Sequence, residues 1–454
     1  MKLAFVLVLL VIGSILFHFY SPWWFTPVAS NWVIIDDTIN ITFWVTGIVF
    51  VLVNLFVAYA IYRFRYDKNR KAAYEPENKK LEVFLTVVTS LGIAIMLAPG
   101  LMVWAKFVEP PENAAKVEIV GQQWQWTYRF PGKDKVFGRT DRRLFSIDNP
   151  FGLEPNDENG QDDILVTSNE LHLPLGQAVK MLLRSKDVLH NFAVPQFRVK
   201  MDLVPGTTTF LWLTPTREGR FDVLCQELCG MAHFTMRGHV VVEAQPRFEK
   251  WLEALPTFAQ TQLKKTTDLM VGQALYTVCS SCHGQRAEGR AEMNAPALAG
   301  LSGAYIRRQL AHYKAGIRGG DARDVFGQQM AAMGATLVDS EAVDNVAAYI
   351  ATLQGEPGTQ RLLPTLQGNA VKGQHFFQNC SSCHGKSGEG NESSGAPKLA
   401  GQHDWYLKRQ LENFKNGVRG VHSKDQYGQQ MRLMAKVLKS EQTINDLVAY
   451  VSTL

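Results

Sequence analysis

The stretch Cys225-Gln-Glu-Leu-Cys229-Gly-Met-Ala-His233-Phe-Thr-Met236 places two thiols, an imidazole and a thioether within twelve residues. Thiolate and thioether sulfur are soft ligands that select copper, and copper sites of sulfur and imidazole with a weak axial Met serve electron transfer. Two cysteines four positions apart can bridge two coppers, so a second imidazole is needed from elsewhere. Ser185-Lys-Asp-Val-Leu-His190 supplies it. The alternative is a disulfide between the two cysteines, which would leave the His and Met spacing unexplained.

The sequence here resembles subunit II of the haem-copper cytochrome c oxidases, whose binuclear copper centre, CuA, uses a distant His followed by Cys-x-Glu-x-Cys-Gly-x-x-His-x-x-Met. The resemblance covers residues Ile39 to about Glu243. It implies that two thiolates bridge the coppers, that two imidazoles cap them, and that a thioether and a backbone carbonyl are further ligands: Cys225 and Cys229, His190 and His233, Met236 and Glu227. It also implies that the Glu227 carboxylate binds a magnesium ion shared with subunit I.

The segment Gly121-Gln-Gln-Trp124-Gln-Trp126 resembles an aromatic stretch of the same family. By this resemblance Trp124 lies over the CuA site and passes electrons to it. Tryptophan is also a common core residue, and we expect that role for Trp126.

Length and composition limit the other functions that the chain could have. A chain of 454 residues predicts several domains. The formal net charge of +5 is not gathered in a dense basic arm, so we expect no nucleic-acid binding. All six cysteines fall in pairs with cofactor spacing, which leaves none for a disulfide.

Three apolar runs, Leu3 to Tyr20, Ile39 to Tyr62 and Leu81 to Trp104, predict membrane-spanning helices because a bilayer needs about 20 apolar residues. The first run also fits a signal peptide cleaved near Ala29 or Ser30. We favour a retained helix, because tryptophans follow it in the manner of an interfacial aromatic belt: Trp23, Trp24 and Trp32. The oxidase family usually has two spans, so a third is a departure.

The loop between the second and third runs predicts the orientation in the membrane. Positive residues stay inside, and this loop carries Arg63, Arg65, Lys68, Arg70, Lys71, Lys79 and Lys80. Everything after Trp104 is therefore expected outside. The prediction is a bacterial inner membrane protein with its copper and haem domains on the periplasmic side.

Glu82 lies at the cytoplasmic start of the third run. A glutamate in a first helical turn interacts favourably with the helix dipole by roughly 0.3 to 1 kcal/mol. In related oxidases a glutamate at the matching position is the mouth of a proton channel into subunit I. Both roles stay open for Glu82, and Leu85 replaces the tryptophan usual in the family.

Short alternating segments follow the membrane part and predict a Greek-key β-sandwich. The expected strands are Lys116 to Val120, Gln123 to Phe130, Val179 to Arg184, Thr207 to Thr214 and Gly238 to Val242. The family resemblance implies a cupredoxin fold. The acidic segment Asn149 to Asp163 is expected to be a solvated insertion, with a calcium site as the weaker alternative.

The last part of the chain is a repeat. Gly272-Gln-Ala-Leu-Tyr-Thr-Val-Cys279-Ser-Ser-Cys282-His283-Gly returns 101 positions later as Gly373-Gln-His-Phe-Phe-Gln-Asn-Cys380-Ser-Ser-Cys383-His384-Gly. The same shift relates Phe326-Gly-Gln-Gln-Met to Tyr427-Gly-Gln-Gln-Met. Cys-x-x-Cys-His is the attachment signature of c-type haem. Zinc binding is the alternative, and two matching copies make it unfavourable.

Both repeats resemble class I cytochromes c, and together they resemble a dihaem cytochrome c. The resemblance implies that His283 and His384 are proximal iron ligands, and that the carbonyls of Pro296 and Pro397 accept their second N–H group. Each repeat offers two methionines as sixth ligand. We expect Met330 and Met431, because each precedes by seven positions a Leu that opens the final helix, with Met333 and Met434 as the alternatives.

We therefore expect transmembrane helices, then a cupredoxin-like β-sandwich, then two all-α class I cytochrome c domains. The expected boundaries are a helix or signal peptide at 1–20, a two-helix hairpin at 36–110, a CuA domain at 111–245, a linker at 246–268, and cytochrome c domains at 269–355 and 370–454.

The predicted function is that of subunit II of a proton-pumping cytochrome c oxidase, which passes electrons from two covalent c haems through CuA to subunit I, where O₂ is reduced to water. The expected partners are subunit I, subunit III, the lipid bilayer and an external donor such as a soluble cytochrome c. The alternatives are the corresponding subunit of a CuA-type nitric oxide reductase, and a membrane-tethered electron carrier without an oxidase partner.

Overall fold

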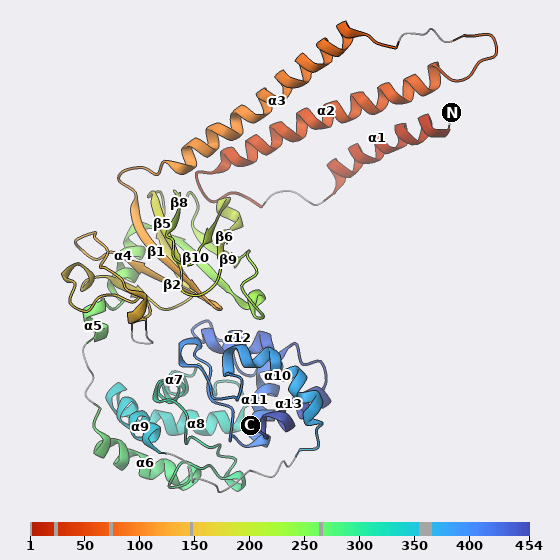
Figure 1. The fold of residues 1–454 in the computed structure, drawn as a ribbon. Coiled ribbons are helices and arrows are strands. Elements are labelled where there is room, and N and C mark those ends of the chain that lie inside the picture. The colour runs from red at the N-terminus through yellow and green to blue at the C-terminus, as the bar shows by residue number, and fades with distance from the viewer. Residues whose placement is uncertain (1, 22–25, 72–75, 146–148, 263–266, 354–365) are drawn as a thin grey trace.

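The protein forms three successive layers along its length. The computed structural model describes residues 2–21, 26–71, 76–145, 149–262, 267–353 and 366–454. Figure 1 shows long helices at one end, a β-sandwich in the middle and a group of shorter helices at the other end.

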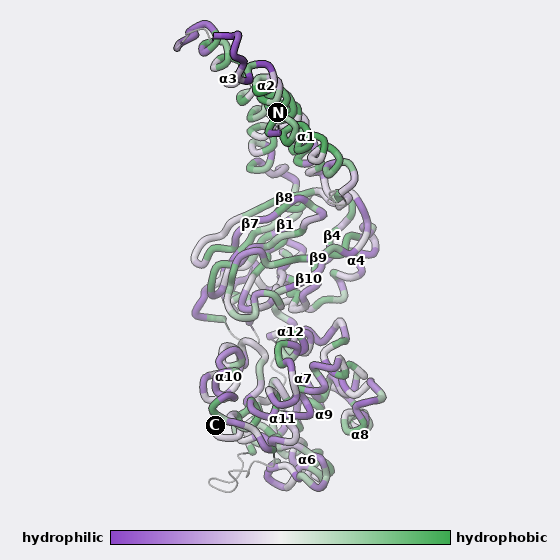
Figure 2. Tube along the Cα trace, turned by 90° about the vertical axis from the view of Figure 1, so that its right-hand side faces the viewer, coloured by the Kyte–Doolittle hydropathy of each residue, from purple (hydrophilic) through white to green (hydrophobic). Residues whose placement is uncertain are grey.

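The three long helices are α1 (Lys2–Tyr20), α2 (Val33–Arg63) and α3 (Lys79–Val108). Each is long and apolar enough to cross a membrane, and their side chains are exposed over nearly their whole length. Figure 2 shows that most residues along these helices are hydrophobic. The three predicted spans are thus confirmed as helices of that kind. The ends of α2 and α3 that flank the basic loop lie far from the sandwich (Figure 1), as the predicted orientation requires.

The junction between helices and sandwich corrects one prediction. Trp32 is not part of an exposed aromatic belt: it is 1% exposed and its indole donates to the carbonyl of Trp212 at 2.8 Å. Its large apolar ring is removed from water by the sandwich itself, which the sequence pattern did not reveal. Trp23 and Trp24 lie outside the described residues. A partly buried ion pair between Asp36 and Arg198, 2.6 Å long, adds to the same junction.

The sandwich consists of two five-stranded sheets. The first has the order β3-β2-β1-β5-β8 and the second β4-β10-β9-β6-β7. The bounds in chain order are β1 Ala115–Gln122, β2 Gln125–Phe130, β3 Ile164–Val166, β4 Glu170–Pro174, β5 Val179–Ser185, β6 His190–Val194, β7 Val199–Leu203, β8 Thr209–Leu213, β9 Gly219–Cys225 and β10 Arg237–Glu243. The five predicted strands are confirmed, and five more were missed.

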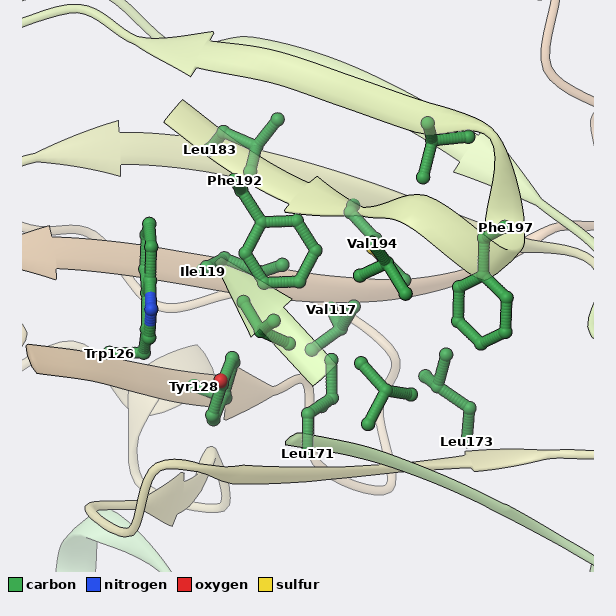
Figure 3. Packing of buried hydrophobic residues seen from close by; sticks show 14 of the residues in the cluster. Val117, Ile119, Trp126, Tyr128, Leu171, Leu173, Leu183, Phe192, Val194 and Phe197 are labelled. Atoms are coloured by element: carbon green, nitrogen blue, oxygen red, sulfur yellow. The ribbon is translucent and has the colours of Figure 1, made fainter. Parts of the chain in front are cut away.

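The core lies between these sheets and is built from alternating inward-facing residues. Figure 3 shows Trp126 at one end of it, beside Phe192. Trp126 is fully buried and meets Phe192 edge to face at 5.4 Å between ring centroids. The prediction that Trp126 is a core residue is therefore confirmed.

The segment 149–163 is not the solvated insertion that its acidic composition suggested. Phe151 and Leu153 are fully buried, and Asp163 is 0% exposed. Asp163 accepts hydrogen bonds from Arg129 at 2.7 Å and from the Gly138 amide at 3.0 Å. The prediction was wrong because a buried arginine on β2, distant in sequence, gives this carboxylate a partner inside the protein.

After α4 (Gln245–Glu253) and α5 (Phe258–Gln262), the remaining helices form two matching sets. The first repeat contains α6 (Leu269–His283), α7 (Gly303–Lys314), α8 (Val325–Ala335) and α9 (Ser340–Thr352). The second repeat contains α10 (Ala370–His384), α11 (Asp404–Lys415), α12 (Gln426–Ala435) and α13 (Glu441–Val451). Every helix of the second repeat begins 101 positions after its counterpart, so the sequence repeat is also a structural one. Short 3₁₀ helices also occur in the described part of the chain, and one of them, η4 (His233–Thr235), bears on the site.

Candidate metal and haem sites

The strand ends of the second sheet place the expected copper ligands together. β6 begins at His190 and β9 ends at Cys225, and these strands are hydrogen-bonded neighbours in which Phe192 pairs with Cys225. The chain then passes through η4, which begins at His233, and enters β10 one residue after Met236. The ligand loop therefore turns back over the end of the strand that carries His190.

The distances show how closely these groups converge. An imidazole nitrogen of His190 and the sulfur atoms of Cys225 and Cys229 lie within 4.8 Å of one another. The two sulfur atoms are 3.8 Å apart as free thiols. Cys229 Sγ is 3.4 Å from His233 Nδ1 and 3.8 Å from Met236 Sδ, and Cys225 Sγ is 3.3 Å from the Glu227 carbonyl oxygen. All six groups named from the sequence lie in one cluster.

The surroundings of His190 are suited to a metal ligand. Its Nε2 is 2.8 Å from Asp187 Oδ1, while its Nδ1 is buried and makes no hydrogen bond. A carboxylate on one ring nitrogen fixes the ring and leaves the other nitrogen free to bind a metal. Burial alone would lower the pKa of His190, but the bond to Asp187 outweighs it and the pKa is raised. The donor set of two thiols, two imidazoles and a thioether fits copper.

The thiols also respond to each other. Cys225 has its pKa lowered to about 3, chiefly by the hydrogen bond from Cys229. A thiolate is the form of cysteine that binds a metal. The carbonyl of Cys229 accepts hydrogen bonds from the Gln123 side chain at 2.7 Å and from the Trp124 indole at 3.2 Å. The β1–β2 turn, which carries these two residues, therefore holds the ligand loop in position.

The two haem motifs end their helices in the same way. His283 closes α6 and donates from Nδ1 to the Pro296 carbonyl at 2.8 Å, and His384 closes α10 and donates to the Pro397 carbonyl at 2.9 Å. Burial lowers the pKa of both histidines, so that each is neutral at pH 7. Neutral imidazole with one nitrogen occupied can bind a metal through the other.

A cavity of about 910 Å³ lies between these motifs. It is lined by residues of both repeats, including His283, His384, Cys279, Cys380 and Cys383. Burial raises the pKa of Cys380 to about 12 and raises that of Cys279 and Cys383 as well. These partly buried thiols lie at the wall of the cavity, where thioether attachment of a haem requires them.

Buried arginines supply a further test of whether haem fits this cavity. Arg308, Arg318 and Arg419 line it, and the Nε–H of each is buried without a partner. An orphaned buried donor is costly, and a haem carries two carboxylates that can accept from it. The residues present therefore fit a pair of covalently attached haems.

All four candidate axial methionines line the cavity, namely Met330, Met333, Met431 and Met434. Met333 is 40% exposed, whereas Met434 packs against the core of the sandwich.

The final helices α9 and α13 begin at Ser340 and Glu441, so Leu337 and Leu438 lie three residues before them and do not open them. The structure therefore does not support the spacing argument for Met330 and Met431. Both members of each pair lie on one short helix, α8 or α12, so the choice between them stays a prediction.

Glu82 lies apart from these sites, in the first turn of α3 at the membrane end of the molecule. Its side chain is exposed. Asn78 caps the same turn by accepting from the Leu81 amide at 3.1 Å. Among the described residues, His190 and the two thiols form the one cluster with metal-ligand geometry. The described residues of the acidic segment 149–163 form no such cluster, so the structure gives no support to a calcium site there.

Sequence reasoning missed two contributors to the copper cluster. Asp187 was not singled out, although its position three residues before His190 is the available signal. Gln123 was also missed, and nothing in its sequence context distinguishes it from a strand-end polar residue.

The fold and the sites define a membrane-anchored chain with a copper-type β-sandwich and two cytochrome c domains. Residues 115–245 match the family described as cytochrome C oxidase subunit II, periplasmic domain, and residues 269–354 and 370–454 each match the family cytochrome c. The alternative cytochrome c oxidase subunit 2 of Bradyrhizobium diazoefficiens is 58% identical over 57% of this chain and 94% of its own length. The chain belongs to the cytochrome c oxidase subunit 2 family.

Two further proteins are similar to parts of the chain. The cytochrome c oxidase subunit 2 of Cereibacter sphaeroides is 30% identical over 50% of this chain and 77% of its own length. Reduced cytochrome c4 from Pseudomonas stutzeri is 29% identical over 42% of this chain and all of its own, with a TM-score of 0.34. The two families imply copper and haem c as cofactors and other oxidase subunits, such as subunit I, as partners.

Proposed function

We propose that this chain is the subunit through which electrons enter a proton-pumping cytochrome c oxidase. Cys225 and Cys229 would bridge the binuclear CuA, His190 and His233 would cap it, and Met236 and the Glu227 carbonyl would complete it. Cys279 with Cys282 and Cys380 with Cys383 would attach two haems through thioether bonds. When bound, these groups accept and release electrons one at a time, and O₂ would be reduced to water in subunit I.

The observation that carries the proposal is the convergence of six donor groups, from two separate segments, on one sandwich end. Asp187 orients His190, and the Gln123 and Trp124 side chains hold the loop carbonyl of Cys229. A centre that changes charge without changing shape needs ligands that are fixed in advance. This fixed cluster suits electron transfer better than it suits binding of a substrate.

The remaining parts of the proposal concern the setting. The exposed apolar helices support a bacterial inner membrane location with the sandwich on the periplasmic side. Subunit III, a soluble cytochrome c as donor and a magnesium ion on the Glu227 carboxylate are proposed from the resemblance described above. The two relatives named above that match the oxidase subunit 2 family are oxidase subunits, which does not favour a nitric oxide reductase.

One experiment tests the assignment as a whole. The purified membrane complex is assayed for consumption of O₂ and of nitric oxide, with reduced cytochrome c as donor, and for the mixed-valence copper signal by electron paramagnetic resonance. We expect O₂ consumption, a copper signal and two c haems. Consumption of nitric oxide instead, or purification without a haem-copper subunit, would contradict the proposal.

The axial ligands can be identified by substitution. Met330→Ala and Met431→Ala should each lower one haem potential and erase the sulfur-to-iron charge-transfer band of that haem, because a thioether ligand raises the potential. The matched controls are Met333→Ala and Met434→Ala, which should leave both bands in the oxidised spectrum. Loss of a band in a control variant, with retention in its neighbour, would reverse the assignment for that repeat.

The role of Glu82 can be separated from its helix-dipole contribution. Glu82→Gln should slow proton uptake during reduction of subunit I, while stability changes by no more than roughly 1 kcal/mol. Glu77→Gln, which removes the same charge from the exposed segment just before α3, is the control and should leave uptake unchanged. Unchanged turnover in Glu82→Gln with an altered melting temperature would return Glu82 to a purely structural role.

A further inference from the structure

The two cytochrome c repeats are alike in fold, but they occupy different positions. Figure 1 and Figure 2 both show α12, from the second repeat, next to the sandwich, while α6 of the first repeat lies at the far end of the molecule. This asymmetry bears on the route of electrons and rests on the proposed function above.

The second repeat touches the copper cluster directly. α12 contacts η4, the short helix that begins with the copper-ligand candidate His233. Gln430 on α12 donates from Nε2 to the backbone carbonyl of Trp124 at 2.6 Å. Met434 and Cys383 pack against the core of the sandwich. A thioether cysteine of the second haem motif therefore lies at the contact.

The same surface is uncovered in the first repeat. Gln329, which corresponds to Gln430 after the shift of 101 positions, is exposed, and so are Val325 and Met333. Their counterparts on α12, Gln426 and Met434, are each partly buried. One repeat thus has its helix against the copper loop, while the other presents the equivalent helix to solvent.

The two repeats are joined to each other by a paired hydrogen-bond network. Arg318 donates to Gln309 in its own repeat and to Tyr406 and Gln410 in the other, at 2.7, 2.9 and 3.1 Å. Arg419 makes the corresponding bonds to Gln410, Gln309 and Tyr305, at 2.6, 2.8 and 3.5 Å. Both arginines are buried, 6% and 8% exposed.

Further hydrogen bonds also join one repeat to the other. Arg308 donates to the Gly395 carbonyl and Arg409 to the Asn294 side chain, each at 2.5 Å. The Gln402 side chain pairs with both the amide and the carbonyl of Ala297, at 3.1 and 2.9 Å. These bonds hold the two haem motifs around one cavity.

We infer that the two repeats transfer electrons in series. The first repeat receives electrons from outside, and the second repeat passes them to the copper loop across the contact between Gln430 and Trp124. Each transfer moves one electron. The oxidation state of the donating centre rises by one, and that of the accepting centre falls by one. An external one-electron donor protein supplies the first repeat. Gln430 is a positioning residue in this sequence.

The test compares two matched variants of the intact oxidase complex. Gln430→Glu places a carboxylate against the Trp124 carbonyl, while Gln329→Glu makes the same change on the exposed helix of the first repeat. After flash reduction of the c haems by a ruthenium photoreductant, the copper near-infrared band reports the rate of transfer. We expect Gln430→Glu to slow it roughly tenfold, which corresponds to about 1.4 kcal/mol and is within the cost of leaving a polar group unpaired.

The control should transfer at the normal rate. Each variant adds one carboxylate beside a candidate axial methionine, so any shift of haem potential should be similar in the two variants, while only Gln430→Glu slows the transfer. An unchanged rate in Gln430→Glu, or an equal slowing in Gln329→Glu, would overturn the inference. A complex that lacks the copper signal or the c haems would instead contradict the proposed function, so the two failures are distinguishable.

A second pair of variants tests the order directly. Cys380→Ala with Cys383→Ala leaves haem attachment only in the first repeat, and Cys279→Ala with Cys282→Ala leaves it only in the second. We expect transfer to copper to be lost in the first of these chains and to persist in the second. Persistence of transfer in both chains would mean parallel routes and would overturn the serial order. If a repeat without haem prevents assembly of the complex, the comparison of Gln430→Glu with Gln329→Glu tests the inference instead.

Discussion

A Cys229→Ser chain is expected to lose its mixed-valence copper signal completely while both c haems remain. Cys229 lies at the centre of the cluster: its sulfur is within 3.8 Å of the sulfur atoms of Cys225 and Met236 and 3.4 Å from His233. A serine oxygen is a hard ligand that does not replace a soft thiolate for copper. Because the proposed binuclear centre needs both bridging thiolates, we expect the loss of one to abolish the mixed-valence signal.

Cys225→Ser should have the same effect, because the proposed centre uses both cysteines as bridging ligands. Met236→Leu is the graded control: it keeps the volume of a buried apolar side chain and removes only a weak ligand, so copper should stay bound with an altered redox potential. Electron paramagnetic resonance and metal analysis of the purified complex measure both outcomes. A mixed-valence signal that survives either serine substitution would show that the bridging assignment is wrong.

The second large effect is expected in the stability of the sandwich. Arg129→Leu should destabilise the fold by roughly 3 to 5 kcal/mol, the usual cost of removing one partner from a buried ion pair. Arg129 is 2% exposed and bonds both Glu118 and Asp163 at 2.7 Å. Glu118 retains Arg184 at 2.5 Å, whereas Asp163 keeps only the Gly138 amide. Asp163 is therefore the group that carries most of the cost.

The effect should depend on pH in a defined direction. Burial raises the pKa of Asp163 from 3.8 to about 6, in spite of Arg129. Because the folded pKa is the higher one, the contribution of this carboxyl to stability is present below pH 3.8 and is lost as the pH rises through about 6. Without Arg129 the folded pKa rises further. The deficit of Arg129→Leu should therefore be larger at pH 7 than at pH 4.

Denaturant unfolding of the purified chain at both pH values measures this. Arg139→Leu is the matched control, because Arg139 pairs with Glu154 at 3.1 Å on the surface, with 71% of its side chain exposed, and surface pairs contribute about 0 to 1 kcal/mol. Adding Asp163→Leu to Arg129→Leu should recover part of the loss. Equal losses in the two single arginine variants would show that burial of Arg129 is not what stabilises the fold.

The sequence predicted what local spacing determines. The helices α1, α2 and α3 follow from uninterrupted apolar runs, and the metal and haem motifs follow from residues a few positions apart. The strand β6 was missed because His190-Asn-Phe-Ala-Val is buried along its whole length and has no alternation of period two. Trp32 and Asp163 were misjudged for a related reason: their environments are made by Trp212 and Arg129, which are far away in the chain.

The sequence also could not predict which of the two haem repeats packs against the copper loop. The shift of 101 positions predicts that the repeats have the same fold, but identical motifs carry no information on which of them meets the copper loop. Gln329 and Gln430 occupy the same place in Phe326-Gly-Gln-Gln-Met and Tyr427-Gly-Gln-Gln-Met. The packing of α12 on η4 and the hydrogen bond from Gln430 to the Trp124 carbonyl distinguish them.

The two contact surfaces of the second repeat differ in strength, and this decides where the molecule comes apart first. Between the repeats, Arg318 and Arg419 are buried and bonded across the boundary in both directions. Towards the sandwich, Gln430 makes a single side-chain bond to the Trp124 carbonyl. Partial opening follows the boundary with the fewest buried contacts. Thermal agitation should thus detach the cytochrome pair from the sandwich as one rigid unit, so that the two haem domains separate from copper before they separate from each other.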